Sequence, residues 1–200
     1  AAVLKKRGIF IPNVHFANSI TFLRFPETRS LGVRLGILLY GVMPPEEAGK
    51  SYEEVPLRPV MSLKTKVVQI QTVSSGSKVG YHAKEIVSRN SIIGVIPLGY
   101  YHGVDRKMIK NGYVLIRGKK APFIGAISMN AAMIDLTDIP DVRIEDDVTL
   151  FGNHDVQGIT LNDLASRTGT IAAELMMRFG NSIERKYVYK GEEVSTSVVF

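Results

Sequence analysis

Four short segments of the sequence carry residues whose types could perform chemistry. The first is the segment 15–19 (His-Phe-Ala-Asn-Ser), which closes an apolar run that we predict to be a buried strand. A hydroxyl group and backbone N–H groups at the carboxyl end of such a strand can hold a phosphate. Asn18 and Ser19 can equally cap a helix that begins there. The pattern by itself leaves both roles open.

The second candidate is Arg34, a single charge within the apolar run 32–41. A buried guanidinium costs free energy unless it is paired or hydrogen-bonded. We therefore predict that Arg34 is buried against an acceptor, which is either a structural carboxylate or an atom of a bound cofactor. Gly36 follows two residues later and would allow a ligand to approach the backbone closely, because glycine has no Cβ.

The third and fourth candidates are Tyr100 and Met129. Tyr100 lies between the apolar run 92–97 and Gly103. A tyrosine in that place can be exposed in a cleft, where burial and a nearby cation would tune its acidity, or it can cover a strand edge. Met129 lies near the end of the segment 125–130 (Gly-Ala-Ile-Ser-Met-Asn), where a methionine more commonly serves packing.

Other kinds of site have little support. His82, His102 and His154 do not have the spacing of zinc ligands, and the acidic residues between 138 and 147 do not have the spacing of a calcium loop. The sequence also has no phosphate-binding Gly-Lys-Ser/Thr loop and no dinucleotide-binding glycine motif. We therefore expect no metal site.

Composition excludes further classes of function. The net charge is +6, from 25 basic and 19 acidic residues, but the basic pairs are scattered, which favours a solvated basic surface over a nucleic-acid site. No apolar run approaches the roughly 20 residues that span a bilayer. The chain has no cysteine, and nothing in it indicates an oxidising compartment. We expect a cytoplasmic protein that binds neither nucleic acid nor membrane.

The elements that must position these residues change character along the chain. Residues 1–41 have the pattern of β–α–β units, with 32–41 as a buried parallel strand. The segment 44–59 is rich in proline and glutamate and indicates a boundary. Beyond it we predict strands at 61–73, 79–83, 92–97, 113–117, 122–128, 132–136, 148–151 and 184–189, and two late helices at 160–167 and 171–178.

Taken in this order, the features resemble alanine racemase, a pyridoxal-phosphate enzyme of fold type III. The similar segments are 15–19, 32–41, 58–65, 79–81, 97–100, 118–121, 125–129, 134–140 and 169–171, so that the resemblance covers nearly the whole chain. It implies an α/β plus mainly β fold. Residues 1–55 would be the last part of a TIM-type (β/α)8 barrel that binds the cofactor, and residues 56–200 the C-terminal β domain.

The resemblance also implies roles for the residues of the first unit. Ser19, Gly36 and Ile37, with Asn18 alongside, would bind the phosphate of pyridoxal 5'-phosphate, and Arg34 would face the pyridine nitrogen. Because arginine stays cationic, it would donate a hydrogen bond to that nitrogen and disfavour its protonation. The ring would then be a moderate electron sink, as suits racemisation through an aldimine.

In the second unit, the resemblance implies that Tyr100 exchanges the substrate α-proton on one face, opposite a lysine on the other. An ordinary tyrosine pKa near 10 is too high for a base at neutral pH, so nearby positive charge must stabilise the phenolate. Met129 would lie near the carboxylate of a small amino-acid substrate. The resemblance further implies a homodimer whose subunits share their active sites.

The sequence departs from the family in ways that affect function. The segment that carries the cofactor lysine is missing, so we expect this chain alone to be inactive and to be a fragment of a complete enzyme. His102, Ala126, Asn130 and Ala173 replace residues usual in the family. Small side chains at entrance positions favour a wider entrance and a racemase for a larger amino acid. A non-catalytic remnant, or a dimerisation or binding module, is the alternative from another class.

Overall fold

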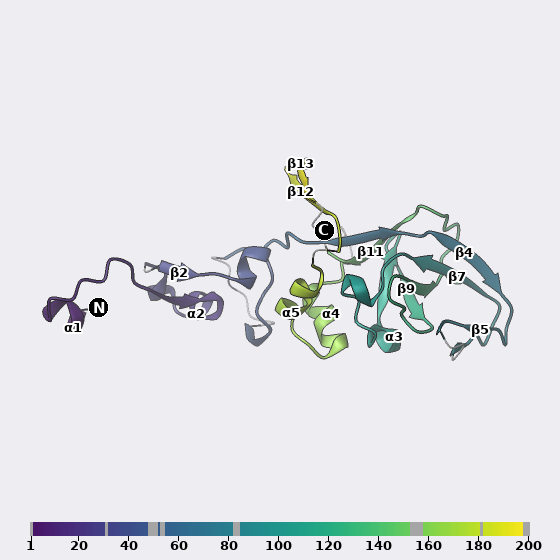
Figure 1. The fold of residues 1–200 in the computed structure, drawn as a ribbon, viewed down its shortest axis with the longest axis horizontal. Coiled ribbons are helices and arrows are strands. Elements are labelled where there is room, and N and C mark those ends of the chain that lie inside the picture. Colours follow the sequence, from purple (N-terminus) through teal and green to yellow (C-terminus); the bar gives the residue numbers. More distant parts are fainter. Residues whose placement is uncertain are drawn as a thin grey trace. The chain divides into compact units, whose positions relative to one another are not determined.

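The computed structural model describes residues 2–30, 32–47, 52, 55–81, 85–152, 158–180 and 182–197. The chain divides into two compact units, Ala1–Met61 and Ser62–Phe200, and Figure 1 shows the elements of each. Among the described residues no helix is long and apolar enough to cross a membrane. The same residues contain no group of three or more side chains that could hold a metal ion.

The first unit is built around a parallel β–α–β arrangement. It contains α1 (Ala2–Lys6), β1 (His15–Asn18), α2 (Ser19–Arg24), β2 (Gly32–Arg34) and short 3-10 helices at Pro26–Ser30, Ile37–Tyr40 and Pro45–Glu47. β1 and β2 pair in parallel, and their register sets Asn18 beside Arg34. The predicted β–α–β pattern is therefore confirmed, although β1 was predicted to be buried and is buried only at Ala17, and the described residues of this unit form one strand pair and no barrel.

The run 32–41 is the main correction in this unit. Only Gly32–Arg34 is a strand, and it is exposed along its length, whereas a buried strand was predicted. The run then turns into the 3-10 helix Ile37–Tyr40, which ends at Gly41 in the left-handed conformation. A Cβ at Gly41 would lie 1.9 Å from the carbonyl oxygen of Arg58, so the chain bends where only glycine fits. Apolar composition predicted burial, but composition does not reveal which elements cover a strand.

The second unit is a curled antiparallel sheet of seven strands in the order β3-β11-β8-β9-β10-β7-β4. The strands are β3 (Leu63–Lys66), β4 (Gln69–Val73), β7 (Ser91–Ile96), β8 (Tyr113–Ile116), β9 (Lys119–Ile124), β10 (Ala132–Asp135) and β11 (Asp147–Phe151). Each overlaps a predicted strand, although β9 begins three residues before the predicted strand 122–128 and ends four residues before its predicted end. Apolar and polar residues alternate in some of these strands, and others, such as β8, are short apolar runs, which made them visible in the sequence.

One segment forms both edges of this sheet. β3 pairs with β11 and β4 pairs with β7, yet only Val67 and Val68 separate β3 from β4. The N–H of Val67 donates to Asp146 and that of Val68 to Val95, so the segment passes from one end of the sheet to the other without a break in hydrogen bonding. Figure 1 shows residues 63–73 as a nearly continuous blue ribbon. The sheet must curl because its first and last strands are neighbours in the chain.

Two late helices complete this unit, as predicted. α4 (Leu161–Thr168) begins at Thr160, whose hydroxyl accepts from the N–H of Asp163, and ends at Gly169 in the left-handed conformation. α5 (Ala172–Arg178) buries Ala172 and Leu175. The core joins these helices to the sheet, with Ile134, Leu150, Phe151 and Leu164 fully buried.

Several small elements were not predicted or differ from their prediction. α3 (Met108–Asn111), β6 (Glu85–Ile86) and β13 (Glu192–Ser197) are additional, and β13 pairs with β12 (Arg185–Tyr189) in a separate hairpin. Their polar or short sequences carry little periodic signal. The predicted strand 79–83 is represented by β5 (Lys78–Val79); residues 82 and 83 lie outside the described residues.

Candidate functional site

The structure brings together two of the predicted phosphate-binding residues in the first unit. Ser19 is nearly buried at the start of α2, and its Oγ accepts a hydrogen bond of 3.1 Å from the N–H of Gly36. A hydroxyl that accepts in this way can still donate its own hydrogen. No described atom lies within 4 Å of the place that a Cβ of Gly36 would occupy. The local geometry therefore offers a donor beside open space and suits a phosphate.

Asn18 and Ile37 flank this pair. The side chain of Asn18 accepts from the N–H of Thr21 at 2.9 Å, so Asn18 caps α2. Ile37 begins the 3-10 helix that follows Gly36. Of the two roles left open for Asn18, the structure shows the cap.

Arg34 differs from its prediction. It is exposed rather than buried, and its Nη1 lies 2.7 Å from Nδ1 of His15 on the neighbouring strand. This partner is neither a carboxylate nor a cofactor atom. His15 faces Gly32 in the parallel register, and the pairing of β1 with β2 sets the histidine within reach of Arg34. The sequence could not show this contact, because it depends on which strands pair.

In the second unit, the structure brings Tyr100 to the turn that carries Met129. The N–H groups of Tyr100 and Tyr101 donate to the carbonyl oxygens of Ser128 and Met129, both at 3.0 Å. A Cβ at Gly99 would lie 2.3 Å from the oxygen of Ser128, so only glycine permits this approach. Tyr100 is 48% and Met129 49% exposed, which leaves both side chains accessible on a fixed backbone.

His102 closes the short 3-10 helix Tyr100–His102. Its Nδ1 accepts from the N–H of Gly99 at 3.2 Å, and its ring lies edge-on to Tyr101 with 5.4 Å between centroids. Burial lowers the pKa of His102, because a charged imidazolium is less well solvated there. The neutral ring is also the form that can accept from Gly99.

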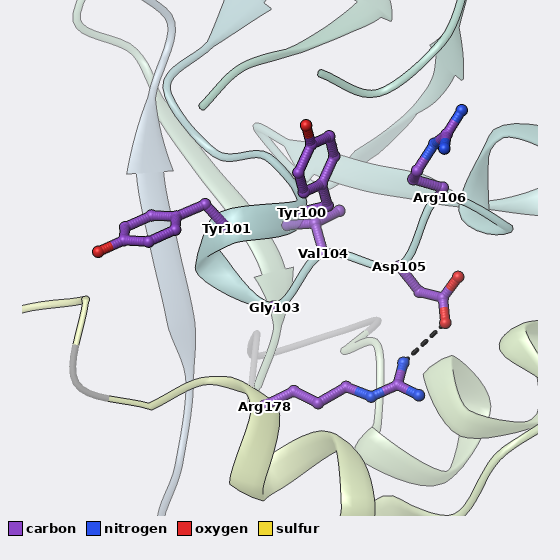
Figure 2. Close-up of a pocket in the computed structure, with 7 residues that line it drawn as sticks. All are labelled: Tyr100, Tyr101, Gly103, Val104, Asp105, Arg106 and Arg178. Carbon is purple, nitrogen blue, oxygen red and sulfur yellow. Dashed lines mark hydrogen bonds and ion pairs between the residues drawn. The ribbon is translucent and has the colours of Figure 1, made fainter. Parts of the chain in front are cut away.

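Tyr100 lines an open pocket, shown in Figure 2 with Tyr101, Gly103, Val104, Asp105, Arg106 and Arg178. Arg178 is engaged by two carboxylates, Asp105 and Glu174, each at 2.7 Å. Burial raises the pKa of Asp105, but hydrogen bonds from Lys107 and Arg178 outweigh it and hold the pKa below its usual value. Arg178 is thus neutralised, and in Figure 2 the hydroxyl of Tyr100 points away from it.

A second tyrosine, Tyr81, was not singled out in the sequence analysis. Gly80 has a φ of +83°, and a Cβ there would lie 2.8 Å from Cα of Gly125. This backbone contact sets Tyr81, which is 65% exposed, next to the start of the segment that leads to Met129. The available signal was the glycine before Tyr81 within the resembling segment 79–81.

Comparison with known proteins places these features in a family. Residues 60–187 match the family described as "Alanine racemase, C-terminal domain". Alanine racemase 1 of Clostridium acetobutylicum is 38% identical over 191 residues, which are 96% of this chain and 49% of the relative. The alanine racemase of Methanococcus maripaludis is 37% identical over 93% of this chain and 49% of its own length.

Solved structures agree. The alanine racemase of Clostridium difficile 630 in complex with cycloserine superposes with a TM-score of 0.90 at 31% identity, over 99% of this chain and 51% of that one. The alanine racemase of Bacillus anthracis with bound L-Ala-P gives a TM-score of 0.88 at 30% identity, over 98% and 50%. The chain spans about half the length of the relatives that it matches.

Proposed function

The chain belongs to the alanine racemase family, and from that premise we propose that it forms the C-terminal half of an amino-acid racemase that interconverts L- and D-alanine. The observation that carries this proposal is the fixed backbone of the segment 125–129. The N–H of Tyr100 donates to Ser128 in this segment, and Gly80, the residue before Tyr81, packs against Gly125. The whole enzyme would be a cytoplasmic homodimer that takes a small amino acid.

We assign the phosphate of pyridoxal 5'-phosphate to Ser19 and Gly36, with Asn18 and Ile37 alongside. The hydroxyl of Ser19 and the open space at Gly36 support this assignment. Arg34 is accessible and would turn its guanidinium toward the ring nitrogen. When bound, the cofactor withdraws electrons from the α-carbon of the amino acid.

Racemisation requires a proton to leave one face of the α-carbon and another to arrive at the opposite face. Two acid/base groups must therefore flank the substrate, and this chain would supply one of them. Tyr100 is our prediction from the sequence, and Tyr81 is the second candidate that the structure adds. The tyrosine that does not transfer the proton would narrow the entrance, and Met129 would lie beside the substrate carboxylate.

The test uses the complete enzyme with Tyr100→Phe and Tyr81→Phe, and with Tyr187→Phe on the exposed hairpin as the control. Loss of a positioned acid/base should lower kcat by about 10²–10⁴-fold in one of the first two variants. That variant should still exchange the α-hydrogen of one enantiomer with deuterium from solvent, because the base on the other face remains.

A merely structural defect would suppress exchange of both enantiomers. If Tyr100→Phe and Tyr81→Phe both racemise alanine at the rate of the control, the assignment to this chain is wrong and the non-catalytic module is favoured.

A second candidate is a racemase for a larger amino acid. Ala173 is exposed at the start of α5, and Ala126 is only partly buried. Comparing kcat/KM for alanine with that for serine, lysine and arginine decides between the two. A preference for a long side chain that Ala173→Tyr abolishes would support the larger substrate.

A further inference from the structure

A basic hollow in the second unit shares Arg106 with the pocket of Tyr100 but contains none of the residues assigned to proton transfer or to the cofactor. It encloses about 520 Å³ and is lined by Arg106, Lys107, Lys110 and Arg167, with Ala126 on its wall. None of the residues that line it is a carboxylate. The volume is in the range of small-molecule sites, about 300–1,000 Å³.

Among the described residues, three arginines elsewhere in the unit are paired with carboxylates, unlike these four cations. Arg89, Arg117 and Arg178 all form ion pairs with aspartates. In the part of the chain that the structure describes, the four cations of the hollow have no carboxylate within salt-bridge distance. The Nζ atom of Lys107 donates to the carbonyl of Thr168 at 3.2 Å, and its backbone N–H donates to Asp105. Their positive charge is therefore not neutralised locally.

Arg167 is held in a fixed position beside this hollow. Its guanidinium lies 4.1 Å from the ring centroid of Tyr113, and its Nη2 donates to the hydroxyl of Tyr113 at 2.8 Å. The Nη1 atom of Arg167 is buried and has no hydrogen-bond partner among the described residues. A buried donor without an acceptor destabilises the folded state, so an acceptor at this place would stabilise the fold.

Arg106 lines both this hollow and the pocket of Tyr100. Figure 2 shows its side chain directed away from the Asp105–Arg178 pair. Ala126 carries only a methyl group and so leaves the wall of the hollow open. The planar fork of an arginine and the ammonium groups of lysines are the side chains that recognise phosphate and carboxylate.

We propose that this hollow binds a small dianion, a phosphate or a dicarboxylate, through Arg106, Lys107, Lys110 and Arg167. The site shares no residue with those assigned to the cofactor phosphate, all of which belong to the first unit. It requires no racemase activity, so the two proposals can fail independently.

Tyr113 offers a spectroscopic reporter of occupancy. Burial raises the pKa of Tyr113, but the hydrogen bond and charge of Arg167 outweigh it, and Lys120 adds to the lowering, so that the pKa lies below its usual value. A bound dianion would offset those cations and raise the pKa of Tyr113. Subtracting the titration of Tyr113→Phe isolates this phenol from the other tyrosines.

The experiment measures binding of inorganic phosphate and of malonate to the complete enzyme, loaded with pyridoxal phosphate, by calorimetry at fixed ionic strength. The variants are Arg106→Gln and Lys110→Gln, and Lys64→Gln on an exposed strand position is the matched charge control. Saturable binding should weaken about tenfold or more in the two hollow variants, as expected for loss of a hydrogen bond to a charged group. Lys64→Gln should bind like the wild type.

Binding of phosphate alone identifies a phosphate ligand, and binding of malonate alone identifies a dicarboxylate; either supports the site if the hollow variants lose it and the pKa of Tyr113 rises. The proposal is overturned if neither anion binds saturably, or if Arg106→Gln and Lys110→Gln bind as well as Lys64→Gln. Retained binding in those variants would place the anion elsewhere on the protein.

Discussion

Gly80 and Gly125 meet backbone to backbone, and this contact decides where Tyr81 leaves the chain. Both have a positive φ, of 83° and 65°. A Cβ on Gly80 would lie 2.8 Å from Cα of Gly125 and 2.9 Å from the nitrogen of Ala126. Backbone atoms cannot rotate aside as a side chain can, so a substitution here must displace a strand end.

We predict that Gly80→Ala destabilises the protein more than Gly76→Ala does. Both glycines have a φ of +83°, so both substitutions carry the left-handed strain of about 1–2 kcal/mol. Only Gly80 adds the backbone clash, because nothing lies within 4 Å of a Cβ at Gly76. Urea unfolding of the two variants gives the difference in their free energies of unfolding. Equal values would contradict the prediction, because they would show that the backbone at Gly125 moves aside without loss of stability.

Whether the surroundings of a single residue could be predicted from the sequence depended on which residue it contacts. The association of Ser19 with Gly36 was implied by the resemblance, and the structure shows their hydrogen bond. The environment of Arg34 was not predictable, because the contact with His15 requires the parallel register of two strands. The part played by these residues in catalysis remains a prediction.

At the scale of elements, the 3-10 helix Tyr100–His102 has a cap that can titrate. The ring of His102 accepts from Gly99 only when neutral, and burial holds its pKa below the usual value. The unfolded chain, with a histidine pKa of about 6.5, therefore binds a proton at a higher pH than the folded chain does. Stability therefore falls progressively as pH drops from the unfolded-state pKa to the folded-state pKa, and the loss persists below both values.

We expect the free energy of unfolding to keep the contribution of His102 above about pH 6.5 and to lose it as pH falls through the folded-state pKa. The variant His102→Gln cannot titrate and should show a shallower fall over this range. Urea unfolding of both proteins at a series of pH values measures the slopes. Identical slopes would mean that the imidazole is as easily protonated in the folded protein as in the unfolded chain.

The elements that were predictable are those with a strong period. The strands around Val95, Leu115 and Ile134 alternate or form short apolar runs, and α4 has a cap at each end. The prediction of one buried strand over residues 32–41 was wrong because this apolar run forms a short strand and then a 3-10 helix. β13 is exposed almost throughout, and its sequence offers no apolar face to detect.

At the scale of the whole molecule, the second unit depends on the continuity of residues 63–73. Val67 is fully buried at the point where the segment passes from β3 to β4, whereas Val68 is 44% exposed. The N–H of Val67 donates to Asp146, just before β11, and that of Val68 donates to Val95 in β7. Of the two residues that join β3 to β4, it is therefore Val67 whose burial stabilises the folded state.

We predict that Val67→Ala lowers the free energy of unfolding by about 2 kcal/mol, from the lost methyl groups and the cavity they leave. Val68→Ala removes the same atoms from a half-exposed position and should cost about 0.5 kcal/mol or less. Thermal or urea unfolding of the pair is the measurement. Equal losses in the free energy of unfolding would indicate that Val67 is no more buried by the sheet than Val68 is.

The curled sheet also has a consequence for synthesis on the ribosome. β4 meets its partner β7 soon after it emerges, but β3 pairs with β11, which is translated about 80 residues later. At about 5–20 residues per second, that partner arrives roughly 4–16 s after β3. During this interval the nascent chain carries an unsatisfied strand edge, so a chaperone that covers nascent chains should raise the yield of this protein more than that of one whose strands pair in the order of translation.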